Sequence, residues 1–170
     1  MSGARTSGDR TNSARVSGDR AMSGRLVAPA LRVATAATLT ESGYLHAKLY
    51  VDGYRFIHDV GVMFLLQASV SFAVAALLLL GGPPVLRLVA AGTAAGALTG
   101  FVASRTVGVF GFTEHGFQPH PQALLSVLAE SATLVLLAAL WVYGAVTART
   151  ERAARAEERA GWAARGWRRV

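Results

Sequence analysis

Residues 60–80 constrain this chain most, because they form 21 consecutive residues without a charge and end in four leucines. An α-helix rises 1.5 Å per residue, so about 20 apolar residues cross the ~30 Å hydrocarbon core of a bilayer. A soluble protein would have to bury such a helix on every side. We therefore expect residues 60–80 to span a membrane.

A short turn follows this span. The sequence Gly81-Gly-Pro-Pro84 should end the helix, because proline lacks an amide donor and glycine permits a reversal of the chain. With so few residues in the turn, the next helix must return antiparallel. Residues 85–109 are that helix, with Arg87 and Arg105 near its two ends.

Two further spans are predicted. Residues 123–146 form one, with Glu130 as its only charge. Residues 31–49 form the other, although Arg32 interrupts its apolar run and Glu41 lies within it. A secretory signal peptide is the alternative for this first segment, since a basic stretch precedes a short apolar run.

The predicted fold class is therefore all-α, a polytopic membrane protein with a four-transmembrane-helix bundle. The composition agrees, because 52% of the residues are hydrophobic, the mean hydropathy is +0.38, and the charges gather in loops and tails. Cysteine is absent, which excludes disulfides and thiolate metal sites.

The basic residues predict the orientation. Fourteen arginines lie at 5–32, 87 and 149–169, on one side of the predicted spans, whereas Lys48, Arg55 and Arg105 lie on the other. By the positive-inside rule, both termini face the cytoplasm of a bacterial plasma membrane. The same rule accounts for the net charge of +7 without nucleic-acid binding.

Three segments follow from these spans: a tail at 1–25, a transmembrane domain at 26–146 and a tail at 147–170. The first tail has few large apolar residues, so we expect it to be disordered and basic. Met22-Ser-Gly-Arg echoes the opening of the chain, and Met22 is a candidate alternative start. The second tail is alanine-rich and should be a basic cytoplasmic helix.

A small residue recurs at every fourth position along the predicted third helix. Without a hydrophobic force between helices in lipid, small residues allow the close backbone approach on which association depends. The stripe therefore predicts helix packing within the bundle or, alternatively, the seam of a homodimer. Its members are Gly92, Gly96, Gly100, Ser104 and Gly108.

Glu41 and Glu130 are the two carboxylates predicted within spans. An ionised carboxylate there costs about 3 kcal/mol or more, so each should face the bundle, pair or stay protonated. Both fall in the outer half of the bundle, where we expect them to meet, and Gln67 on the second span is a candidate partner. They form either a structural polar clasp or a proton-linked or cation-linked site.

The four histidines lie in or beside the two predicted outer loops. His46, His115, His120 and Glu114 are candidates for a metal site, since imidazole and carboxylate together suit zinc or copper. Their spacing matches no metal motif, and interfacial side chains are the simpler interpretation. We see no catalytic nucleophile and base pair, and no phosphate-binding loop.

The sequence resembles a group of small four-span membrane proteins from GC-rich actinobacteria. The resemblance covers about residues 30–146 and is carried by Leu45-His46, residues 53–57, residues 61–67 and residues 107–114. It implies topology and host class but no activity. It also implies that His46, Arg55 and Glu114 form a polar cluster on the outer face.

The functional expectation is a non-enzymatic accessory or structural component of the membrane. The alternative is a small carrier or redox-accessory protein for protons, a metal ion or a quinone. It would use the intramembrane carboxylates and the outer histidines.

Overall fold

The computed structural model describes the backbone of residues 7–166 and the side chains of residues 24 and 26–162. The described residues form four α-helices and one short 3-10 helix. In chain order these are α1 (Ser7–Asp52), η1 (Tyr54–Phe56), α2 (His58–Leu79), α3 (Val85–Thr106) and α4 (Gln122–Gly166). The prediction of an all-α fold is confirmed.

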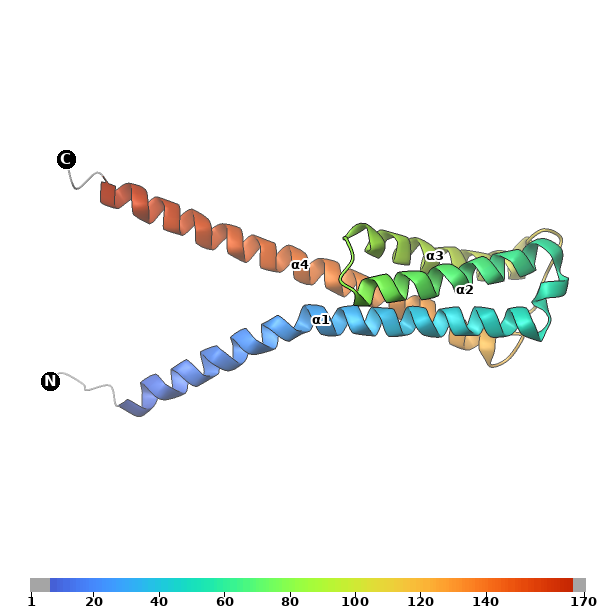
Figure 1. Ribbon diagram of the computed structural model, residues 1–170, viewed down its shortest axis with the longest axis horizontal. Helices are drawn as coiled ribbons and strands as arrows, with labels where there is room; N and C mark the ends of the chain where they lie inside the picture. Colours follow the sequence, from blue (N-terminus) through green and yellow to red (C-terminus); the bar gives the residue numbers. More distant parts are fainter. Residues whose placement is uncertain (1–6, 167–170) are drawn as a thin grey trace.

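The helices form an antiparallel bundle from which two arms extend. Figure 1 shows α2 and α3 beside the second half of α1 and the first half of α4, while the first half of α1 and the second half of α4 diverge at one end. Among the described residues, three helices are long and apolar enough to cross a membrane: α2, α3 and α4 through Trp162. Helix α1 carries Arg32, Glu41 and Lys48 within its predicted span.

Helix α1 nevertheless packs along the length of the bundle, mainly against α2 and α4. Its buried positions recur at helical spacing, as Leu39, Ser42, Leu45 and Leu49 illustrate. A core cluster joins α1 to the other three helices at the end from which the arms extend. It comprises Ala36, Leu39, Val74, Ala75, Leu78, Ala90 and Leu137.

The turn between α2 and α3 has the structure that the sequence predicts. Gly81 adopts a φ of +83°, a conformation in which a side chain would be strained. Its N–H donates to the carbonyl of Leu78 and that of Gly82 to the carbonyl of Leu77, which together form a Schellman C-cap. The antiparallel return of α3 follows from this cap.

The first tail differs from the expectation of disorder, because α1 begins at Ser7. Arginine and alanine favour helix, and adding turns to an existing helix requires no new nucleus. Helix α4 likewise continues through the second tail to Gly166. Residues 1–6 and 167–170 lie outside the described residues.

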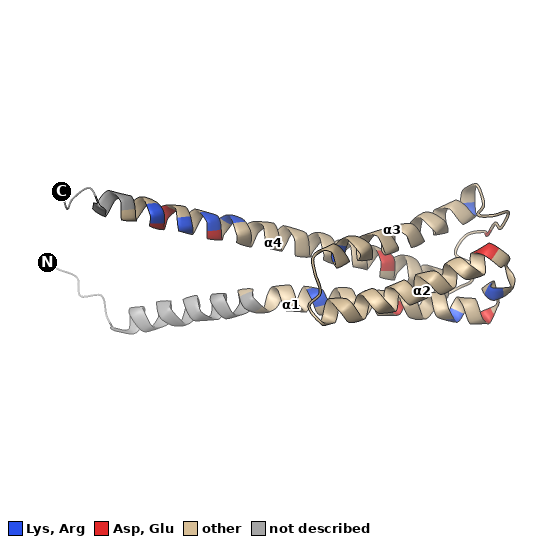
Figure 2. Cartoon of the chain, turned by 45° about the horizontal axis from the view of Figure 1, so that its top comes forward, with Lys and Arg blue, Asp and Glu red and all other residues tan. Residues whose placement is uncertain are grey.

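Charged residues are unevenly placed along this shape. Among the coloured residues, Figure 2 shows them clustered along the second half of α4 and at the opposite end of the bundle, where η1 and the α3–α4 connection lie, with few between. Such a distribution suits a bundle whose middle lies in hydrocarbon, because charge is costly there.

Candidate functional site

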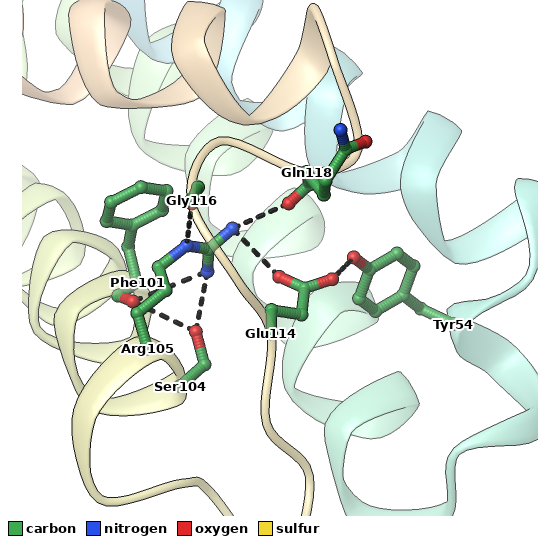
Figure 3. A network of polar contacts seen from close by, with 7 residues as sticks. All are labelled: Tyr54, Phe101, Ser104, Arg105, Glu114, Gly116 and Gln118. Atoms are coloured by element: carbon green, nitrogen blue, oxygen red, sulfur yellow. Dashed lines mark hydrogen bonds and ion pairs between the residues drawn. The ribbon is translucent and has the colours of Figure 1, made fainter.

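An ion pair stabilises the end of the bundle at which η1 and the α3–α4 connection lie (Figure 3). Arg105, in the last turn of α3, places Nη2 2.8 Å from Oε2 of Glu114, and the two side chains are 13% and 16% exposed. The hydroxyl of Tyr54 donates to the other carboxylate oxygen of Glu114. The pair therefore ties η1 and the α3–α4 connection to the end of α3.

The Arg105 guanidinium has no N–H left for a ligand. It has five such hydrogens, and each faces an acceptor within the protein. Besides Glu114, the acceptors are the carbonyls of Gly116 at 2.8 Å, Gln118 at 2.6 Å and Phe101 at 3.4 Å, and Oγ of Ser104 at 2.6 Å.

The environment of Tyr54 keeps its phenol protonated. Burial raises the pKa of Tyr54 well above its ordinary value of 10.0, and the hydrogen bond to Glu114 and the charge of that carboxylate raise it further. The positive charge of Arg105 opposes these effects but does not outweigh them. Tyr54 is therefore a hydrogen-bond donor at any physiological pH.

The outer residues predicted from the sequence do not assemble as one site. Arg55 is exposed and lies over the ring of Phe56, with its Cζ 4.8 Å from the centroid, rather than beside Glu114. His115 and His120 are exposed, whereas His46 is buried inside the bundle. No group of three or more metal-ligating side chains occurs among the described residues.

Glu130 forms a second polar cluster, within the bundle. Its side chain is 1% exposed, and its Oε1 accepts a hydrogen bond from Ser42 and one from Gln67 at 3.4 Å. Its Oε2 is buried without a partner among the described residues. The expected meeting of Glu41 with Glu130 is wrong, because Glu41 lies on the exposed face of α1 and the adjacent Ser42 takes its place.

A cavity of about 590 Å³, here called the bundle cavity, lies mainly between α2 and α3. The α3 wall includes Gly92, Gly96 and Gly100, and the α2 wall includes Phe64 and Gln67. Residues of α1, α4, η1 and the α3–α4 connection complete it: His46, Leu49, Tyr54, Val109, Phe112, Glu114, Pro119, Ala123 and Ser126. Apolar groups dominate this wall.

The bundle cavity explains why the small-residue stripe does not pack as expected within the chain. A Cβ added at Gly92, Gly96 or Gly100 would meet nothing within 4 Å. Ser104 is buried and accepts from Arg105, while Gly108 lies beyond the end of α3 with a φ of +81°. The predicted close helix contact along this stripe is thus wrong within the chain, because its glycines border open space.

Sequence reasoning missed the cavity and the roles of Ser42, Tyr54 and Arg105. The position of Arg105 at the end of an apolar span was the available signal for the ion pair, since a charge there needs a partner. The molecule is thus an all-helical bundle with three helices able to cross a membrane and a mainly apolar cavity that is open on one side. No family model, curated protein or solved structure matches the chain.

Proposed function

We propose that the chain is a four-span protein of the bacterial plasma membrane with both termini in the cytoplasm. The packing of α1 supports the fourth span. The second half of α1 runs beside α2 and α4 through the bundle, which favours a position at the same depth in the membrane. Ser42 and His46 are buried among these neighbours. Glu41, near the middle of the span, is exposed and is therefore a costly charge to place in lipid.

Reporter fusions test this topology. A reporter that is active only in the cytoplasm should be active after residue 170 and in the turn at residues 81–84, and inactive in the connection at residues 107–121. A fusion at residue 1 should match the one at residue 170. Opposite compartments for the two ends would exclude four spans.

We propose further that the protein is a non-enzymatic accessory component that holds one lipid-soluble molecule in the bundle cavity. The open space over Gly92, Gly96 and Gly100 is the observation that carries this proposal. A stripe without side chains keeps about 590 Å³ available, within the ~300–1,000 Å³ typical of ligand sites. The cavity is also mainly apolar, with a few polar groups that can orient a ligand.

Filling the cavity tests this function. Gly96→Leu places a side chain in the open space, whereas Gly144→Leu adds the same group on α4 at a position that also has nothing within 4 Å of its Cβ and lies off the cavity wall. Native mass spectrometry of protein in mild detergent should detect a bound lipid-soluble molecule in wild type and Gly144→Leu, and lose it in Gly96→Leu. Equal retention in both variants would place the molecule elsewhere.

The second candidate function is a proton-linked site at Glu130. The Oε2 of this buried carboxyl has no hydrogen-bond partner in the described part of the chain, which favours this candidate because a protonated carboxyl tolerates such surroundings better than an ionised one. A hydrophobic carbodiimide reacts with protonated carboxyl groups in membranes, so a mass adduct at Glu130 that Glu130→Gln abolishes would support this candidate. An adduct only at the exposed Glu41 would count against it.

A further inference from the structure

The polar groups on the wall of the bundle cavity indicate the chemical class of its ligand. This inference rests on the proposed function and asks what kind of head group the cavity accepts. His46 is the first of these groups, with 8% of the residue exposed and its ring on the cavity wall. Its Nδ1 lies 2.9 Å from the carbonyl oxygen of Ser42.

This contact fixes the tautomer of His46. A carbonyl oxygen only accepts, so Nδ1 must carry the hydrogen. A charged imidazole inside a span would be costly, and no carboxylate pairs with this ring in the described part of the chain, so the ring is neutral. Nε2 is therefore a lone-pair acceptor, and among the described residues it has no hydrogen-bond partner.

Gln67 presents a second unused acceptor. Both hydrogens of its Nε2 are engaged, one with the carbonyl of Thr93 at 3.3 Å and one with Oε1 of Glu130 at 3.4 Å. These two bonds fix the orientation of the amide and leave its carbonyl oxygen without a donor among the described residues. Gln67 also lies on the cavity wall, on the same helix as Phe64, which contacts the ring of His46.

The donors on the wall are, by contrast, already used. Tyr54 donates to Glu114, Thr93 to the carbonyl of Val89, and Ser104 to the carbonyl of Phe101. All five N–H groups of Arg105 are engaged as well. Ser126 is the exception among the described side chains, and its hydroxyl can serve as donor or acceptor.

We propose that the bundle cavity binds an uncharged lipid-soluble molecule whose head is a hydroxyl group, either an alcohol or a phenol. The hydroxyl donates to Nε2 of His46 or to the carbonyl oxygen of Gln67, and the apolar body lies along Gly92, Gly96 and Gly100. A phosphate or carboxylate head finds no free cation on the described wall, because Arg105 is fully engaged. An oxidised quinone offers only acceptors, so it does not complement His46 or Gln67 and could accept only from Ser126.

Paired probes that differ by one donor test the proposal. Farnesol and its methyl ether share an isoprenoid chain, and decylhydroquinone and its dimethyl ether form the matching phenolic pair. Their affinities are measured on the full chain in detergent by equilibrium binding of radiolabelled probe. Wild type should bind the preferred hydroxyl compound about tenfold more tightly than its ether, which corresponds to one hydrogen bond of ~1.4 kcal/mol. The pair with the larger ratio identifies the source as an alcohol or a phenol.

Substitution of His46 locates the donor contact. His46→Phe keeps an aromatic ring but removes one acceptor, and Gln67→Leu removes the other. The variant that lacks the acceptor used by the hydroxyl should show a preference of about twofold or less instead of tenfold, while the ether still binds. The wild-type comparison needs no variant, so the proposal remains testable if His46→Phe fails to fold.

The outcomes separate this inference from the proposed function. Equal binding of alcohol and ether, blocked by Gly96→Leu, would overturn the hydroxyl inference and leave the cavity as a ligand site. A preference that persists in both His46→Phe and Gln67→Leu would also overturn the inference. Binding of no probe, together with no bound molecule in native mass spectrometry, would overturn both.

Discussion

Replacement of Gly96 by alanine distinguishes an open cavity from a helix contact by the sign of its effect. Glycine in a helix interior is less stable than alanine by about 0.5–1 kcal/mol, because it loses more backbone freedom on folding. A Cβ at Gly96 meets nothing within 4 Å, so no steric cost offsets this gain. Gly96→Ala should therefore raise the free energy of unfolding by up to about 0.5–1 kcal/mol.

Gly61 on α2 supplies the matched control. Its added Cβ would lie 2.7 Å from the backbone oxygen of Tyr54 and 3.0 Å from Cα of Arg55. Overpacking against backbone costs about 1–3 kcal/mol, more than the propensity gain returns. Gly61→Ala should therefore lower the free energy of unfolding, so the same substitution has opposite signs on the two helices.

Denaturation in mixed micelles, followed by helical circular dichroism, measures both variants on the same scale. Size-exclusion chromatography with light scattering reports the oligomeric state alongside. If Gly96→Ala lost as much stability as Gly61→Ala, another molecule or helix would occupy the stripe, and the inference of an open cavity would be refuted. A concurrent change from dimer to monomer would identify the occupant as a second copy, which is the homodimer that the stripe also predicts.

Three further outcomes follow from the polar clusters. Because folding raises the pKa of Tyr54, its neutral phenol stabilises the folded state below pH ~10, and this contribution falls as the pH rises above that value. Tyr54→Phe should therefore reduce the loss of stability at alkaline pH, measured by thermal unfolding between pH ~8 and ~11. Glu130→Leu should cost about 1–3 kcal/mol, since it leaves the buried hydroxyl of Ser42 and the half-buried amide of Gln67 without this acceptor, whereas the exposed Glu41→Leu should cost nothing in the same micelle denaturation. Arg105→Lys keeps the charge but not the five-donor fork, so limited proteolysis should cut residues 107–121 faster, and an unchanged rate would contradict the role given to this side chain.

The helices and the first turn could be predicted because their causes are local. An uncharged run of hydrocarbon length and a Gly-Gly-Pro-Pro turn specify α2, its cap and the return of α3 without reference to any neighbour. The helical start of α1 at Ser7 was harder to predict. Composition argues for disorder there, whereas propagation from the ordered part of α1 favours helix.

The side chains around Glu130 could be predicted only in part. The sequence gives the depth of a residue within its span but not the direction in which its side chain points. Glu41 and Ser42 are adjacent and so lie at nearly equal depth, yet one side chain is exposed and the other fully buried. The signal was present in Leu39 and Leu49, which lie three residues before and seven residues after Ser42 and therefore share its helical face rather than that of Glu41. This periodicity places the hydroxyl of Ser42, rather than the carboxylate of Glu41, on the face that meets Glu130.

The glycine stripe is a sequence pattern that does not by itself determine what packs against the helix. A small residue at every fourth position exposes a strip of helix backbone, and the sequence is the same whether a neighbouring helix or a ligand lies against that strip. The two cases differ in what polar groups lie nearby, since a packed seam needs none and a ligand site needs a few that are unsatisfied. Around this stripe, Arg105 has used every donor while His46 and Gln67 keep acceptors, an imbalance that packing does not require. A molecule that brings its own donor removes the imbalance, which is why the hydroxyl of the ligand, rather than its apolar body, is the feature to test.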